Sequence, residues 1–117
     1  MNFNYFLLFI FFLSFLSAQE NKYVSEVTYS GNISFSEKEL NKLIKLRPHN
    51  LFIRNQFSLK KLNRDQLILE SFFKSKGFLN VQITTSFTEP FKNYININYS
   101  IIEGSNYNLK NIYFVGN

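Results

Sequence analysis

Few side chains in this sequence have the types and the spacing that catalysis or metal binding requires. His49 is the only histidine and the chain has no cysteine, so a zinc site or a catalytic triad at His49 would lack its partners. Glu37 and Glu39 are two positions apart, and side chains at that spacing diverge on a helix. We therefore expect His49 to be a loop residue, and we predict no catalytic residue, no metal ligand, no cofactor and no enzymatic activity.

The basic side chains are the second group to consider, because the formal net charge is +5. A basic strip could bind phosphate groups. A solvated helix face is the commoner explanation for lysine and arginine at such spacing, and we do not expect nucleic acid as a partner. The residues that would form the strip are Lys60, Lys61, Arg64, Lys74 and Lys76.

The strongest pattern is an alternation of apolar and polar residues near the C-terminus. Residues 79–87 and Tyr94–Ile102 both alternate in this way, which predicts two strands that each have one solvated face. Pro90 lies between them, in an expected turn at residues 89–93. A short connection of this kind predicts an antiparallel hairpin. The polar positions on the solvated face include Asn80, Gln82, Asn96 and Asn98.

The elements that precede this hairpin have their own local signals. Tyr23–Ser30 is rich in β-branched and aromatic residues and is followed by Gly31 and Asn32, which favour a turn. Ser36 and Glu39 have the spacing of a capping box, so a helix is expected to begin there and to continue, through Leu40, Leu43 and Ile44, to Arg47 before Pro48.

A second helix is expected from Ser58, which can cap its first turn, to Gly77, which fits its end. Its apolar face would carry Leu62, Leu69, Phe72 and Phe73. The segment between the two helices is expected to be an extended connection anchored by Leu51, Phe52, Ile53 and Phe57. The predicted order is strand, helix, helix, strand, strand, which is an α+β domain with both helices on one face of a small sheet.

The N-terminus has the pattern of an export signal. The almost wholly apolar stretch from Tyr5 to Leu16 is followed by Ser17 and Ala18, and it is shorter than the roughly 20 residues that a membrane-spanning helix needs. We expect residues 1–18 to be a signal peptide cleaved after Ala18. An uncleaved anchor or an internal hydrophobic segment is the alternative, since the residues before the apolar stretch lack lysine and arginine and Leu16 is larger than the small residue preferred there.

The C-terminus repeats the start of the domain. Residues 109–117 match residues 24–32 in residue type at most positions, and both segments end in Gly-Asn. A repeat at this spacing indicates an array of similar units. We expect one domain at residues 23–104 and the start of a second unit at residues 105–117.

These features together resemble the POTRA domain of the BamA/TamA family of outer-membrane protein assembly factors. The resemblance implies a β-α-α-β-β fold in which two helices pack on one face of a three-stranded mixed sheet. It also implies a non-catalytic module. The residues that carry the resemblance are Gly31, Asn32, Ser36, Leu40, Asp65, Leu69, Phe73, Gly77, Phe78, Glu103, Gly104, Gly116 and Asn117.

The family fold implies that Tyr94–Ile102 is the central strand, with residues 24–30 on one side and residues 79–87 at the other edge. An edge strand can bind an extended client chain by β-augmentation, because its backbone donors and acceptors face outward. The residues expected to form this client or partner edge are Asn80, Val81, Gln82, Ile83, Thr84, Thr85 and Ser86. The polar side chains on the solvated face could assist by weak contacts, or they could be solvated only.

The resemblance implies a location at the periplasmic face of the bacterial outer membrane. The implied partners are unfolded outer-membrane proteins and accessory assembly proteins, with adjacent POTRA units and a membrane β-barrel if the chain is a fragment. Three other functions stay open at this point. They are a division protein of the FtsQ type, the POTRA domain of a two-partner secretion transporter, and a small secreted basic binding protein.

Overall fold

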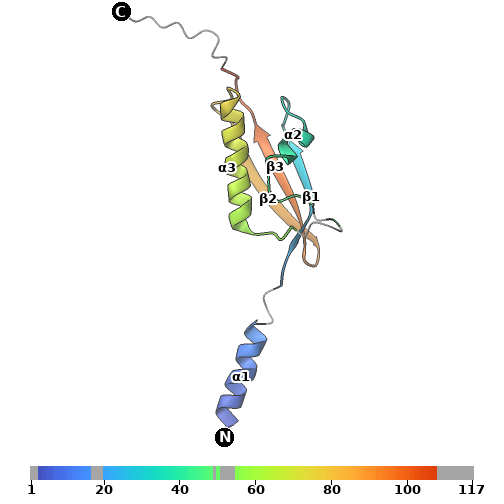
Figure 1. Ribbon diagram of the computed structural model, residues 1–117, viewed down its shortest axis with the longest axis vertical. Helices are drawn as coiled ribbons and strands as arrows, with labels where there is room; N and C mark the ends of the chain where they lie inside the picture. The colour runs from blue at the N-terminus through green and yellow to red at the C-terminus, as the bar shows by residue number, and fades with distance from the viewer. Residues whose placement is uncertain (1–2, 17–19, 49, 51–54, 108–117) are drawn as a thin grey trace, which may run out of the picture.

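The computed structural model describes residues 3–16, 20–48, 50 and 55–107. Helix α1 (Phe3–Leu16) precedes strand β1 (Tyr23–Ser30), helices α2 (Glu37–Asn41) and α3 (Leu59–Ser75), and strands β2 (Gln82–Phe91) and β3 (Tyr94–Ile102) (Figure 1). The order after α1 is the predicted one. His49, Leu51, Phe52 and Ile53, and the repeat at residues 109–117, lie outside the described residues.

The three strands form one mixed sheet in the order β1-β3-β2. Strand β1 is parallel to β3, with Tyr29 beside Tyr99, and β2 is antiparallel to β3, with Ile83 beside Ile101. A parallel pair needs a long crossover, and α2 and α3 supply it between β1 and the hairpin (Figure 1). The central position of β3 and the mixed sheet agree with the fold that the POTRA resemblance implied.

One face of the sheet is buried under the helices and the other is solvated, as the alternation predicted. The buried face joins Tyr29, Ile83 and the alternate residues of β3 to Leu40 of α2 and to Leu62, Leu69 and Phe73 of α3. The opposite face presents polar side chains to solvent, and its exposed members are Glu26, Thr28, Ser30, Gln82, Thr84, Ser86, Thr88 and Ser100. Both helices therefore lie on one face, as expected.

Aromatic rings form much of the core. Tyr29 and Tyr99 stack with ring centroids 5.4 Å apart, and Phe35 contacts Phe73 edge to face at 5.2 Å and Phe78 at 6.1 Å. Burial, with the Asp65 carboxylate as a second cause, raises the pKa of both tyrosines well above the usual range. Both phenols therefore stay protonated and cannot act as bases near neutral pH.

Helix α2 begins as predicted but ends earlier. Ser36 accepts from the backbone N–H of Glu39, the Glu39 carboxylate accepts from the backbone N–H of Ser36, and this capping box lowers the Glu39 pKa. The helix stops at Asn41, so the prediction that it continues to Arg47 was wrong. The cause is Asp65 of α3, which accepts from the backbone N–H groups of two residues beyond the helix end, Lys45 at 3.0 Å and Leu46 at 2.9 Å.

Strand β2 is displaced from its predicted position. Leu79 and Asn80 lie in a turn after α3, and the strand begins at Gln82 and continues through Pro90 to Phe91. The chain reverses at Lys92 and Asn93, where Asn93 has φ 68° and donates its N–H to the Glu89 carboxylate. The predicted start at residue 79 and the predicted turn at residues 89–93 were therefore both wrong in extent. Pro90 fits inside the strand because the pairing with β3 is irregular between Thr88 and Phe91.

Helix α1 is apolar, and its side chains from Tyr5 to Ile10 are exposed. Within the part of the chain that the structure describes, every helix is too short or too polar to span a bilayer. The signal peptide at residues 1–18 stays a prediction.

The position of Phe73 in the centre of the core predicts a large loss of stability in Phe73→Ala. Its ring is completely buried, so truncation leaves a cavity and should lower the free energy of unfolding by about 3–5 kcal/mol. Urea unfolding followed by circular dichroism measures this loss. Leu67→Ala is the matched control, because Leu67 lies on the same helix with 62% of its surface exposed and should change stability little. Equal losses in both variants would contradict the described packing of α3.

The role of Asp65 predicts a second loss of stability, with a different cause. Asp65→Ala removes the acceptor for two backbone donors, one of which belongs to the buried residue Leu46. The expected loss is about 3 kcal/mol, because buried donors left without a partner are costly. Asn63→Ala, an exposed position on the same helix, is the control for helix propensity. Unchanged unfolding midpoints in Asp65→Ala would show that these donors find other acceptors.

Candidate functional site

The two edge strands of the sheet differ in what covers them. The start of β1 is paired with the segment before α3, since Val24 donates its N–H to the Asn55 carbonyl at 3.0 Å and Phe57 donates to the Lys22 carbonyl at 2.7 Å. Tyr23 and Gln56 form an antiparallel bridge in this segment. Among the described residues, the only strand that pairs with β2 is β3. The candidate site is therefore the outer edge of β2.

The hydrogen bonds of β3 show which β2 backbone groups face this edge. The Asn93 carbonyl accepts from Tyr23 and the Ile97 carbonyl accepts from the Thr28 hydroxyl, so the odd-numbered residues of β3 face β1. The N–H and C=O groups of successive residues point to opposite edges of a strand. Those of the even-numbered residues of β3 therefore point towards β2. Over the regular part of the ladder, their partners in β2 are Gln82, Thr84, Ser86 and Thr88. Consequently, Ile83, Thr85 and Phe87 direct their backbone N–H and C=O groups to the outer edge.

This geometry divides the seven residues that sequence analysis proposed for the edge. The backbone N–H and C=O groups of Ile83 and Thr85 face the outer edge, whereas those of Gln82, Thr84 and Ser86 face β3. Asn80 and Val81 precede the strand, and the Asn80 amide donates to the Tyr107 hydroxyl at 3.4 Å. Phe87 completes the outward set but was absent from the proposed residues. That any of them binds a client stays a prediction.

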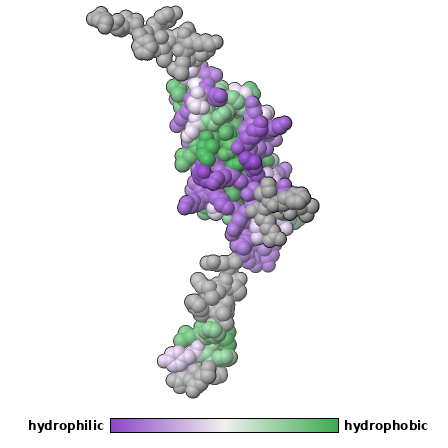
Figure 2. All heavy atoms as spheres, viewed as in Figure 1, coloured by the Kyte–Doolittle hydropathy of each residue, from purple (hydrophilic) through white to green (hydrophobic). Residues whose placement is uncertain are grey.

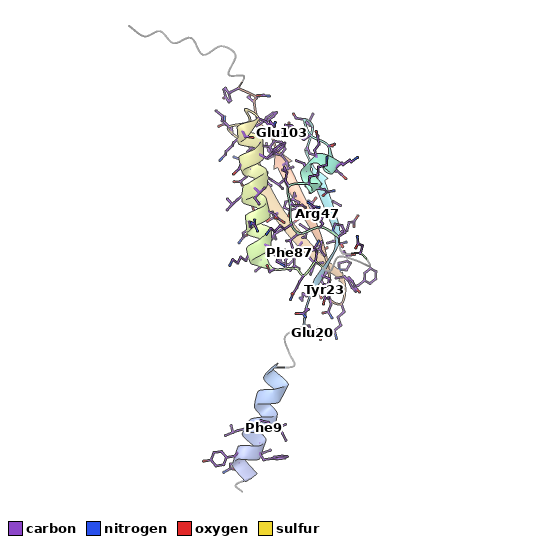
Figure 3. The ribbon with its side chains drawn as sticks, in the orientation of Figure 1. Phe9, Glu20, Tyr23, Arg47, Phe87 and Glu103 are labelled. Atoms are coloured by element: carbon purple, nitrogen blue, oxygen red, sulfur yellow. The ribbon has the colours of Figure 1, made fainter. Side chains whose placement is uncertain are left out.

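Side chains of different character border the edge on its two faces. On the helix side, the ring centroids of Phe87 and Phe57 are 4.9 Å apart, and Phe87 is 45% exposed (Figure 3). On the opposite side, Thr84, Ser86 and Thr88 are exposed hydroxyl residues. A strand that lies along β2 would therefore meet aromatic carbon on one face and polar groups on the other. Sequence analysis identified Phe57 as an anchor but did not associate it with the site.

Several of the amides proposed as weak contact groups are already bonded inside the domain. Asn98 accepts from the Thr28 hydroxyl at 3.0 Å and Asn96 donates to the Glu26 carboxylate at 3.4 Å. Asn80 is engaged by Tyr107, and Gln82 is exposed. These amides mainly tie β1, β3 and the exit segment together, which leaves the backbone of β2 as the stronger candidate for client contact.

Several other residues that carry the POTRA resemblance make structural contacts at the end of the domain where β1 and β3 finish. Gly31 has φ 79°, and a Cβ there would overlap the Ile101 carbonyl. The buried Glu103 carboxylate accepts from the backbone N–H and the hydroxyl of Ser34 at 2.8 and 2.7 Å. Gly77 ends α3 and accepts from the N–H of Tyr107 at 2.9 Å. Gly116 and Asn117 lie outside the described residues.

The basic side chains and the acidic groups suggest no other site. All five side chains of the predicted basic strip are exposed; Lys61 bonds the Gln56 carbonyl and Lys76 lies over the Phe72 ring. Figure 2 shows hydrophilic residues bordering a hydrophobic area on the upper half of the domain in that view. Across the described ranges, which exclude His49, aspartate and glutamate form no group of three that could hold a metal ion.

Comparison with known proteins agrees with this fold. Residues 22–104 match the family described as "POTRA: Surface antigen variable number repeat". A Treponema pallidum (strain Nichols) protein named "Putative outer membrane protein assembly factor" is 23% identical over 100 residues, which cover 80% of this chain and 12% of that protein. The chain thus spans about an eighth of the length of that relative.

Two solved structures are also similar. POTRA domains 3–5 of Haemophilus influenzae BamA superpose with a TM-score of 0.64 at 20% identity, covering 77% of this chain and 37% of that one. CdiB from Escherichia coli covers 71% of this chain and 15% of its own, with a TM-score of 0.47 and 13% identity. The match over residues 22–104 shows that this chain belongs to the POTRA family, a family of non-catalytic modules, and it is a distant relative of outer membrane assembly factors.

Proposed function

We propose that this chain is the exported, periplasmic POTRA module of an outer-membrane β-barrel protein assembly and insertion factor, and that it binds extended client or partner chains along β2. The observation that carries this proposal is the difference between the two edges of the sheet. Residues 55–57 pair with the start of β1, whereas β2 directs the backbone of three successive outward-facing residues away from the sheet.

Binding at this edge needs no chemistry from the side chains of the client. An extended chain would extend the sheet by one strand, with its own N–H and C=O groups bonded to those of Ile83, Thr85 and Phe87. Because the backbone is the same in every client, such a site tolerates many sequences. The position of β2 is fixed by its ladder to β3, so the edge is formed before a client arrives.

The place of this module in a larger assembly rests on the relatives. The Treponema pallidum relative is named for outer membrane protein assembly, and this chain corresponds to 12% of its length. We propose that residues 105–117 begin a second unit, in keeping with the family's description as a variable number repeat. The partners would then be unfolded outer-membrane proteins, accessory assembly proteins and neighbouring POTRA units. Residues 1–18 would direct export and be removed.

A peptide experiment tests whether the backbone of β2 is the site. The probe is a fluorescent peptide of alternating valine and threonine, matched in length to β2 and ended with lysines for solubility, and fluorescence anisotropy gives its Kd. The same peptide with N-methylated central amides lacks the donors for strand pairing. We expect it to bind at least about tenfold more weakly, which corresponds to the loss of more than one net hydrogen bond. Equal affinities of the two peptides would rule out β-augmentation.

Proline substitution tests the same edge from the side of the protein. Ile83→Pro removes an outward N–H and should weaken binding of the unmethylated peptide. Because the Ile83 side chain is buried, this variant can also lose stability, and Thr85→Pro removes an outward donor at a half-buried position instead. Thr84→Val is the control, since it changes the solvated face and keeps every backbone donor. If folded Ile83→Pro or Thr85→Pro binds like Thr84→Val, the edge of β2 is not the site.

A further inference from the structure

One side chain of α3 already occupies part of the β2 edge. The Gln66 Nε2 atom donates to the Ile83 carbonyl oxygen at 3.0 Å, and the Gln66 Oε1 atom accepts from the Thr85 hydroxyl at 3.3 Å. The same Nε2 atom also lies 3.2 Å from a carboxylate oxygen of Glu70, one turn further along the helix. The amide of Gln66 is therefore held between its own helix and two of the three outward-facing residues of β2.

The bond to Ile83 competes with the bond that a client would make. The Ile83 carbonyl belongs to the outward-facing set, so a strand added at this edge would donate an N–H to the same oxygen. Ile83 is only 5% exposed, and its carbonyl is approached on the helix side by the Gln66 amide. An arriving strand must share this acceptor with Gln66 or displace it.

We propose that Gln66 is a latch on the β2 edge, which bonds the Ile83 carbonyl in the free domain and is displaced when a strand is added. This inference rests on the proposed function, because it concerns regulation of the same edge. In the free domain, the latch gives a partly buried acceptor a hydrogen-bond partner, which avoids the cost of leaving it unpaired. It also reduces the unpaired edge that could associate with other strands.

The chemistry of glutamine suits this role. Its amide donates to the backbone of one outward-facing residue and accepts from the side chain of another, so one side chain bonds two residues of the edge. Glu70 offers the displaced Nε2 group an acceptor that does not depend on β2. Because the Phe87 backbone has no bond to Gln66, a client is expected to pair first near Phe87 and to displace Gln66 as pairing extends towards Ile83.

Gln66→Met tests the latch in the 117-residue chain. Methionine has a similar length and similar helix propensity but cannot donate to Ile83. With the alternating valine and threonine peptide as the probe, Gln66→Met should bind about 2- to 10-fold more tightly than the wild type, the factor that corresponds to one net hydrogen bond no longer lost on binding. Asn63→Met is the matched control, because Asn63 is an exposed amide on the same helix, and its affinity should equal that of the wild type.

A second variant keeps the Gln66 amide but removes one of its two hydrogen bonds to β2. Thr85→Val removes the hydroxyl that Gln66 Oε1 accepts from, so it should tighten binding by a smaller factor than Gln66→Met. Weaker binding in Gln66→Met would show that the amide contacts the client and would overturn the latch. Affinities of Gln66→Met and Thr85→Val equal to that of Asn63→Met would overturn it as well.

Hydrogen exchange separates failure of the latch from failure of the proposed function. In the free chain, the Nε2 hydrogens of Gln66 should exchange with solvent more slowly than those of exposed Gln82, as measured by NMR. Equal rates would overturn the latch whether or not any peptide binds. Slow exchange at Gln66 together with no binding of the peptide by the wild type or any variant would instead reject the edge as a client site, and with it the displacement step of the latch.

Discussion

The domain depends on the burial of one side of β3. Its alternate residues Ile95, Ile97, Tyr99 and Ile101 are at most 4% exposed, and burying each large apolar side chain contributes about 1.5–3 kcal/mol. This burial requires helices above the strand and neighbours at both of its edges. Strands β1 and β2 therefore become the two outer strands. Because residues 55–57 are bonded to the start of β1, β2 has the longer edge without a strand partner among the described residues.

Local signals in the sequence were sufficient for most of the elements. The Ser36 and Glu39 pair, the Ser58 cap and Gly77 each act within one turn of a helix, and the structure has all three where they were expected. The end of α2 could not be predicted in the same way, because it depends on Asp65, which lies about 20 positions further along the chain. Asp65 stands in an apolar stripe between Leu62 and Leu69, and that position was the only local sign of its burial.

The candidate site was less accessible to sequence reasoning than the fold. The alternation in residues 79–87 indicated a strand, but the outer position of that strand came from the resemblance to POTRA domains. The boundary at Gln82 depends on how the turn after Gly77 closes, where Val81 donates to the Phe78 carbonyl. Gln66 was not identified, since a glutamine within a helix carries no periodic signal and its bonds to Ile83 and Thr85 exist only after α3 packs on the sheet.

The parallel pairing of β1 and β3 has a mechanical consequence. The chain enters the sheet at Tyr23 and leaves it after Ile102, at opposite ends of two adjacent parallel strands (Figure 1). Tension applied between these two points pulls the strands past each other along their length. All the hydrogen bonds between β1 and β3 then resist in shear at the same time, instead of opening one after another. A pulling force between the two ends of the module would therefore be carried by the β1–β3 ladder as a whole.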